Sequence, residues 1–129
     1  MNQPGRPAVR SVEQAELQAS IFVRAGDVVN GRPLYREIIE RARSAGLSGA
    51  TANLGLQGFG HSAMLRPPAL LRRTGFEPVL IEIADDPARV RAFLPVLDQL
   101  LGSGLVVLRT VTVTRRVAAP PDIAATAAT

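Results

Sequence analysis

The residues whose types and spacing could support chemistry gather between positions 55 and 73. Three glycines stand close together at Gly55, Gly58 and Gly60. Their spacing reverses that of the dinucleotide-binding fingerprint, and no helix is predicted to begin there, so a Rossmann-type site is not indicated. Two interpretations remain. The glycines either turn backbone N–H groups toward an anion, or they permit a tight exit from a strand, and the sequence favours the second.

His61 follows these glycines and is the only histidine of the chain. It could act as a catalytic base, although an exposed loop histidine is more common. No cysteine or close carboxylate accompanies it, so no metal site is predicted. The serines lack a nucleophile motif, and Asp85-Asp86 before Pro87 is explained by helix capping. The sequence therefore predicts no catalytic residues.

Three arginines, Arg66, Arg72 and Arg73, lie in or beside the same stretch. They could pair with phosphates or with an acidic partner surface, whereas each one taken alone is more commonly a solvated loop residue. A connection of about 18 residues between paired strands is unusual, and long connections tend to be functional. We therefore predict that the segment 57–75 is a functional loop.

The composition of the chain limits the remaining classes of function. All fifteen basic residues are arginine, the net charge is +4 and aromatic residues make up 4% of the chain. The arginines are spread rather than clustered, so nucleic-acid binding is not expected, and anionic small ligands fit the charge better. Arg115 and Arg116 could bind a further anion or protect an edge strand from aggregation. No apolar run approaches the roughly 20 residues of a membrane span. With no targeting segment and no cysteine, a cytoplasmic protein is expected.

The elements that must position these residues follow from hydrophobic periodicity. Alternation predicts strands and a spacing of three and four predicts helices. Strands are predicted over 17–24, 50–57, 79–83 and 105–115, and helices over 33–45 and 87–101. This order of strand, helix, strand, strand, helix and strand is typical of the α+β ferredoxin-like sandwich, with two helices on one face of a four-stranded antiparallel sheet.

A single domain over residues 16–116 is expected, with a disordered arm over 1–15 and a disordered tail over 117–129. The helices cover only one face of the predicted sheet. On the other face the last strand would place either one of two sets of residues: Val107, Val111 and Val113, or Leu108, Thr110 and Thr112. Apolar residues on an uncovered sheet face favour self-association, so we predict a homo-oligomer.

A set of motifs then points to a family. The motifs, in chain order, are Gly31-x-Pro33-Leu34-Tyr35, Ile39-x-x-Ala42, Gly46-x-x-Gly49-Ala50-Thr51, Gly55-x-x-Gly58-Phe59-Gly60, Val79-x-Ile81-Glu82-Ile83 and Phe93-Leu94-Pro95. In order and spacing they resemble the PII-like domain-of-unknown-function family one-ninety over residues 17–115. The resemblance implies a ferredoxin-like fold, a trimer built around the sheets, and kinship with PII signal-transduction proteins.

The resemblance also implies a site. PII proteins bind adenine nucleotides between subunits and use a long loop after the second strand to engage transporters, channels or enzymes. By position, Gly58, Phe59 and Gly60, followed by His61, correspond to the base of that loop. Gly102-Ser103-Gly104 corresponds to the loop between the second helix and the fourth strand, and is shorter than in PII with no cation. Arg115 and Arg116 correspond to basic residues near the C-terminal end.

The sequence thus supports one main hypothesis and two alternatives. The main one is a non-enzymatic, trimeric PII-like regulator that binds a small anion between subunits, with ATP, ADP and AMP as candidates. Its 57–75 loop, with Arg66, Arg72 and Arg73, would contact a transporter, channel or enzyme. The alternatives are a small ferredoxin-like enzyme that uses His61 in a sheet-face cavity, and a purely structural adaptor.

Overall fold

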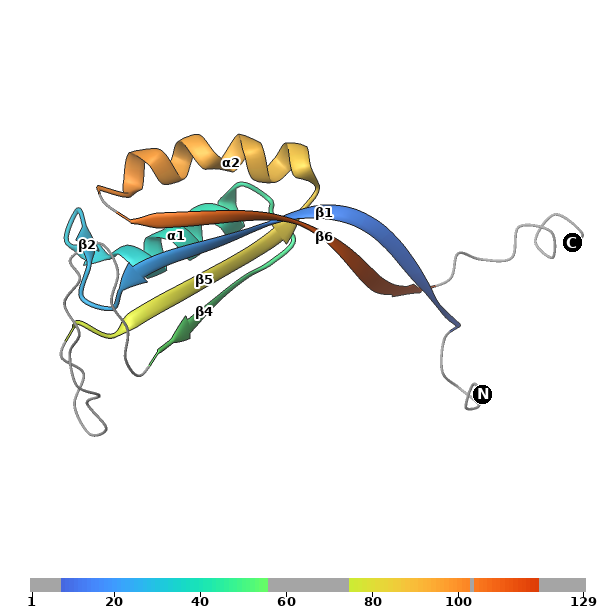
Figure 1. The fold of residues 1–129 in the computed structure, drawn as a ribbon, viewed down its shortest axis with the longest axis horizontal. Helices are drawn as coiled ribbons and strands as arrows, with labels where there is room; N and C mark the ends of the chain where they lie inside the picture. Colours follow the sequence, from blue (N-terminus) through green and yellow to red (C-terminus); the bar gives the residue numbers. More distant parts are fainter. Residues whose placement is uncertain (1–7, 56–74, 103, 119–129) are drawn as a thin grey trace, which may run out of the picture. The chain divides into compact units, whose positions relative to one another are not determined.

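The computed structural model describes residues 8–55, 75–102 and 104–118 (Figure 1). One compact unit spans Glu16–Val111, and the described residues before 16 and after 111 form a second. The strands are β1 (Val9–Arg24), β2 (Val28–Val29), β3 (Arg32–Pro33), β4 (Ala50–Leu54), β5 (Pro78–Asp85) and β6 (Leu105–Ala118), and the helices are α1 (Leu34–Ser44) and α2 (Pro87–Leu100). Among the described residues, neither helix combines the length and apolarity needed to span a membrane.

The main sheet has the strand order β4–β5–β1–β6, and β2 and β3 form a separate small hairpin. β5 pairs antiparallel with β1 on one side and with β4 on the other. Both helices lie on the same face of this sheet (Figure 1). The predicted fold class, a ferredoxin-like sandwich with a four-stranded antiparallel sheet, is confirmed.

The core lies between the sheet and the two helices, where alternate strand residues meet one stripe of each helix. Ile21 of β1, Ile81 of β5, Ile38 of α1 and Phe93 of α2 are all at most 2% exposed. The rest of this core consists of Leu17, Ala19, Val23, Leu34, Ala42, Val79, Ile83, Val90, Leu97 and Leu100. Burial of each large side chain contributes roughly 1.5–3 kcal/mol, which makes this layer the main source of stability.

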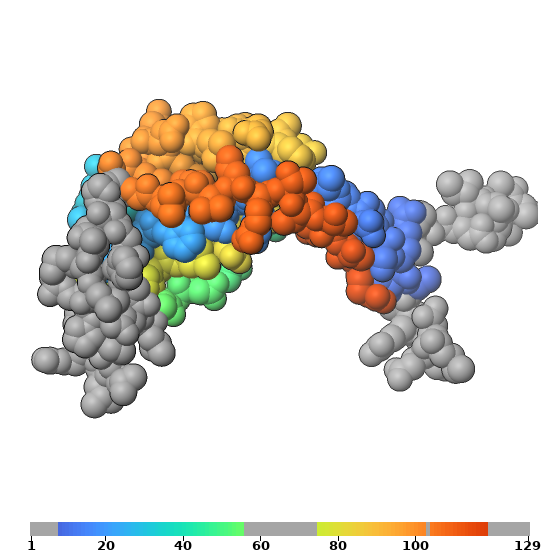
Figure 2. All heavy atoms as spheres, viewed as in Figure 1, coloured from blue at the N-terminus to red at the C-terminus, as the bar shows by residue number. Residues whose placement is uncertain are grey.

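Neither α1 nor α2 covers the opposite face of the sheet, and Figure 2 looks onto that face. Val106 of β6 packs against the core, so its neighbour Val107 lies on the open face. Phe22 of β1 also lies there, since Ile21 and Val23 on either side of it are buried. Of the residues that begin the two predicted sets, Val107 is therefore the one on the open face. Phe22 and Val107 are 42% and 39% exposed.

Several element bounds differ from those read in the sequence. β1 begins at Val9 rather than at residue 17, so residues 9–15, expected to be disordered, are extended. β6 continues to Ala118, past the predicted end at 115. Most of these additional residues are exposed, so they lack the buried alternate positions on which the strand prediction depends. β4 ends at Leu54, before the predicted end at 57.

The helix ends follow local rules. Gly46 has φ +78° after α1, the left-handed conformation with which glycine commonly ends a helix. Asp86 caps α2, with its side chain accepting a hydrogen bond from the Ala88 N–H at 3.1 Å. Pro33 was predicted to be the first residue of the helix. It is instead the N-cap of α1 and the last residue of β3, so the helix begins one residue later, at Leu34.

Candidate functional site

The two ends of the predicted functional loop leave the sheet on neighbouring strands. Gly55 follows β4, and the chain returns at Gly75 just before β5. The register places Leu54 opposite Val79, and Arg24 at the end of β1 opposite Pro78. The base of the loop therefore lies at one end of the sheet, beside the last residue of β1.

The returning chain is fixed to the end of β1 by hydrogen bonds. The Ala25 N–H donates to the Glu77 carbonyl and the Gly26 N–H to the Gly75 carbonyl, both at 2.9 Å. The Arg24 guanidinium donates to the Phe76 carbonyl at 2.6 Å. These bonds extend the β1–β5 pairing past the end of the regular strands. They join residues 75–77, where the chain returns from the loop, to the sheet.

Glycine permits this close approach. A Cβ atom on Gly26 would stand 2.9 Å from the Gly75 carbonyl oxygen, a distance that real Cβ atoms essentially never show. Gly75 itself has φ +88°, a conformation that side chains other than glycine rarely adopt. Its N–H donates to a carboxylate oxygen of Glu77 at 2.8 Å, and Glu77 is only 8% exposed. The geometry of the loop base thus depends on a glycine pair and a buried glutamate.

A tight turn connects the loop base to the first helix. The Asp27 carboxylate accepts from the Arg24 N–H at 2.9 Å, and the Asp27 N–H donates to the Arg24 carbonyl at 3.1 Å. The Leu34 N–H, at the start of α1, donates to the Asp27 carbonyl at 2.8 Å. The β2–β3 hairpin closes the intervening chain, with Val28 opposite Pro33. A change at the loop base can therefore reach the first turn of α1 through one short path.

The junction between α2 and β6 lies at the same end of the sheet. A Cβ on Gly104 would stand 3.4 Å from the carbonyl oxygen of Phe22, two residues before the end of β1. Gly104 thus lies beside β1, the strand whose end holds the loop base. Among the predicted site glycines in the described ranges, Gly104 is the one with a neighbour on that strand.

Most of the other predicted site residues lie outside the described part of the chain. They are Gly58, Phe59, Gly60, His61, Arg66, Arg72, Arg73 and Ser103. Arg115, half-buried, and Arg116, exposed, belong to the second unit, on β6. In the described ranges, no cluster of three or more histidine, cysteine, aspartate or glutamate residues could hold a metal ion.

The sequence did not single out Arg24, Asp27 or Glu77 as site residues. In the sequence, Gly26-Asp27 has the signature of an ordinary loop, and Glu77 carries no signal. Arg24 and its partner Phe76 are 52 positions apart, so no local pattern could have paired them. A glycine on each side of the contact was the available hint, because glycines at two strand ends permit close backbone approach.

At the other end of the sheet, Asp85 fixes the connection between α1 and β4. Its carboxylate accepts from the Ser48 N–H at 2.8 Å and from the Asp86 N–H at 2.7 Å. Burial by itself would raise the pKa of Asp85, but these hydrogen bonds, together with the nearby Arg89, hold it below its ordinary value. The predicted capping role therefore belongs to Asp86, and Asp85 joins two loops.

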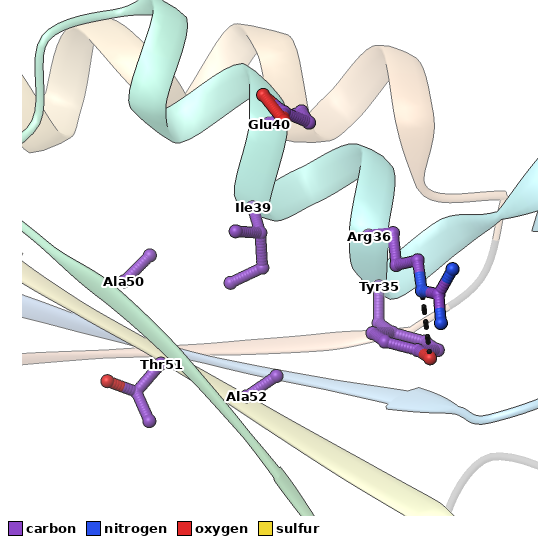
Figure 3. Close-up of a pocket in the computed structure, with 7 residues that line it drawn as sticks. All are labelled: Tyr35, Arg36, Ile39, Glu40, Ala50, Thr51 and Ala52. Carbon is purple, nitrogen blue, oxygen red and sulfur yellow. Dashed lines mark hydrogen bonds between the residues drawn. The ribbon is translucent and has the colours of Figure 1, made fainter.

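A hollow of about 520 Å³ opens between α1 and the edge strand β4 (Figure 3). Tyr35 and Ile39 of α1 and the methyl groups of Ala50 and Ala52 face one another across it, and Thr51 points away. Arg36 and Glu40 also line it. In the sequence, these α1 residues fit the ordinary pattern of an amphipathic helix, so they gave no sign of this hollow.

Comparison with known proteins identifies relatives over most of the chain. The model of the DUF190 family, described as uncharacterized ACR, COG1993, matches residues 17–113. A UPF0166 protein of Aquifex aeolicus (strain VF5) is 32% identical over 95 residues, covering 72% of this chain and 88% of the relative. A UPF0166 protein of Methanocaldococcus jannaschii is 29% identical over 89 residues, covering 68% and 82%.

Solved structures share the fold. CPII of Thiomonas intermedia K12, bound to ADP and bicarbonate, matches with a TM-score of 0.58 and 18% identity, over 81% of this chain and 93% of that one. A second structure of CPII, a nitrogen regulatory PII-like protein bound to ADP, AMP and bicarbonate, matches with a TM-score of 0.52 and 16% identity, over 81% and 98%. The fold of this chain is therefore PII-like.

Proposed function

The chain belongs to the DUF190 family, and from this premise we propose that it is a non-enzymatic PII-like regulator that binds an adenine nucleotide between subunits of a homotrimer. The bound ligand sets the conformation of the 57–75 loop, which contacts a partner protein such as a transporter, channel or enzyme. A ligand can do this only by binding one loop state more tightly than the other.

The observation that carries the proposal is the convergence at one end of the sheet. The loop leaves after Gly55 and returns at Gly75, and the α2–β6 junction passes within contact distance of β1 at Gly104. These are the segments that correspond by position to the two loops of a PII ligand site. The PII-like protein CPII, which has the same fold, binds ADP and AMP. A nucleotide at this end of the molecule would lie next to the base of the loop that it is proposed to control.

Calorimetric titration of the full chain with ATP, ADP and AMP, each with and without bicarbonate, tests the ligand. We expect at least one of them to bind well below a Kd of about 1 mM, which corresponds to roughly 4 kcal/mol. GTP is the matched control, since it carries the same phosphates on a different base. Failure of every adenine nucleotide to bind below about 1 mM would refute the nucleotide part of the proposal.

Two variants examine the basic residues on β6. Arg116→Ala should weaken nucleotide binding severalfold if its guanidinium contacts phosphate. Arg10→Ala is the control, because Arg10 is also an exposed arginine of the second unit, on the other long strand. Equal affinities of the two variants would remove Arg116 from the site. Measurement of the mass in solution tests the trimer, and a stable dimer would contradict it.

A further inference from the structure

β4 is the outermost strand of the main sheet and pairs only with β5 among the described residues. The Gly55 N–H donates to the Pro78 carbonyl at 2.7 Å, which sets the direction of the backbone groups along the strand. In an antiparallel ladder, alternate residues direct their N–H and C=O groups to opposite sides. Asn53, like Gly55, therefore bonds toward β5, and Ala52 and Leu54 direct their backbone groups to the free edge.

Ala52, which directs its backbone groups to the free edge, also lines the hollow. Ala52 and Leu54 stand opposite Ile81 and Val79, both of which point to the helix side of the sheet. A strand added to this edge would place the side chain opposite Ala52 on that same side, in the hollow beside Tyr35 and Ile39 (Figure 3). Strand-edge hydrogen bonds and a side-chain pocket thus occur at one position, as in peptide recognition by strand addition.

The charge at the rim of the hollow defines the partner further. Arg41 and Arg43 of α1 pair with glutamates at 3.0 and 3.6 Å. In the described ranges, Arg36 has no carboxylate within ion-pair distance. Its guanidinium donates to the Tyr35 hydroxyl at 3.3 Å and lies 5.8 Å from the centre of the Tyr35 ring. Arg36 lies in the first turn of α1, above Ala52 in Figure 3. An acidic side chain of the added strand, placed near Leu54, would therefore lie on the same side of the hollow as Arg36.

A second copy of this chain is a poor match for that edge. The two outer strands of the sheet are β4 and β6. Neither contains an acidic residue, and β6 carries Arg109, Arg115 and Arg116. Either strand from another subunit would leave Arg36 without a carboxylate, and β6 would bring further positive charge to the same edge.

We propose that the β4 edge binds an extended segment of another protein as an added strand. An apolar side chain of the segment fills the hollow opposite Ala52, and an acidic side chain two positions away pairs with Arg36. The spacing of two follows from strand geometry, because alternate residues of the added strand share a face. This proposal goes beyond the proposed function and concerns only the β4 edge and the start of α1.

The experiment is a selection of random linear peptides displayed on phage against the full chain, followed by binding measurements on the enriched peptides. We expect sequences with an apolar residue and an acidic residue two positions apart. Ala52→Pro removes an edge N–H that makes no bond to β5, and edge strands tolerate proline there. It should lower peptide affinity about tenfold or more, with the circular dichroism spectrum unchanged.

Charge variants and hydrogen exchange complete the test. Arg36→Glu should lower affinity by about tenfold, whereas Arg91→Glu, at an exposed arginine of α2, should leave it unchanged. Bound peptide should protect the Ala52 and Leu54 amides, and the Asn53 amide should be protected with or without it. The proposal is overturned if no such peptides are enriched, if Ala52→Pro binds them normally, or if both charge variants weaken binding equally. Concentration-dependent protection of the Ala52 amide without peptide would also overturn it, because a second copy would then occupy the edge.

Discussion

Replacing Gly26 by alanine should test the close contact at the base of the loop. The added Cβ would stand 2.9 Å from the Gly75 oxygen, 3.0 Å from its Cα and 3.3 Å from its carbonyl carbon. All three atoms are backbone, so no side chain can rotate away. Either the two segments separate by several tenths of an ångström, or the hydrogen bond from the Gly26 N–H lengthens. Overpacking of this kind costs typically 1–3 kcal/mol.

Urea unfolding followed by circular dichroism measures the effect. With a slope of about 1–3 kcal/mol per molar urea, a loss of about 2 kcal/mol lowers the midpoint by roughly 1 M. Gly49→Ala is the matched control, since a Cβ there would meet no atom within 4 Å. It should be neutral or stabilise the protein by up to about 1 kcal/mol, because alanine reduces the entropy of the unfolded chain.

The same pair of variants links the contact to function. If ADP binds beside the loop base, Gly26→Ala should weaken ADP affinity under conditions in which both variants are fully folded, and Gly49→Ala should not. Amide exchange at Gly26 should accelerate in the first variant alone. Equal midpoints for the two variants, with unchanged Gly26 protection, would refute the claim that the Gly26–Gly75 approach is tight.

Three further predictions concern the rest of the molecule. Asp85→Ala leaves the Ser48 and Asp86 N–H groups without their acceptor and should cost about 2–4 kcal/mol in urea unfolding, while Asp98→Ala at an exposed position of α2 should change stability by less than about 0.5 kcal/mol. The pKa of Asp85 in the folded protein is lowered from 3.8. Its contribution to the free energy of unfolding is therefore present above pH 3.8 and is lost as the pH falls through the folded pKa. In Asp85→Asn, the free energy of unfolding should decrease less steeply below pH 3.8 than in the parent protein. An unchanged acid profile would exclude Asp85 as the responsible group. Phe22→Ser on the open sheet face should shift the assembly toward monomer in sedimentation experiments, and an unaltered mass would exclude this face from the interface.

The parts of the fold that were predictable are those encoded by neighbouring residues. The cap of α2 follows from Asp86 and Pro87, and the end of α1 follows from Gly46, because each depends on a few consecutive backbone groups. The alternation of β1 around Ile21 was readable since one side of the strand is fully buried. The strand order then followed from the number and type of elements, because few topologies accommodate them.

The site was less predictable because it is made by contacts between distant positions. Glycine-rich segments were recognised at both 55–60 and 102–104, but sequence alone could not place Gly55 and Gly104 at one end of the sheet. The buried Glu77 looks like an ordinary polar residue before a strand, and its role is visible only when the Gly75 N–H is seen to donate to it. The hollow beside Ala52 was equally hidden, because an alternating strand does not reveal that it lies at the edge of a sheet.

The loop base and the hollow are connected through the first residues of α1. The Asp27 carbonyl, in the turn next to the loop base, accepts the first N–H of α1 from Leu34, and the next residue is Tyr35, which lines the hollow. Tyr35 is the only tyrosine and the chain has no tryptophan, so its fluorescence reports this region without labelling. If nucleotide binding moves the Arg24–Asp27 turn, ADP should change Tyr35 emission, and Gly26→Ala should reduce the change. Emission that stays constant while calorimetry shows saturation with ADP would mean that the ligand acts on the loop without moving α1, and that the two surfaces work independently.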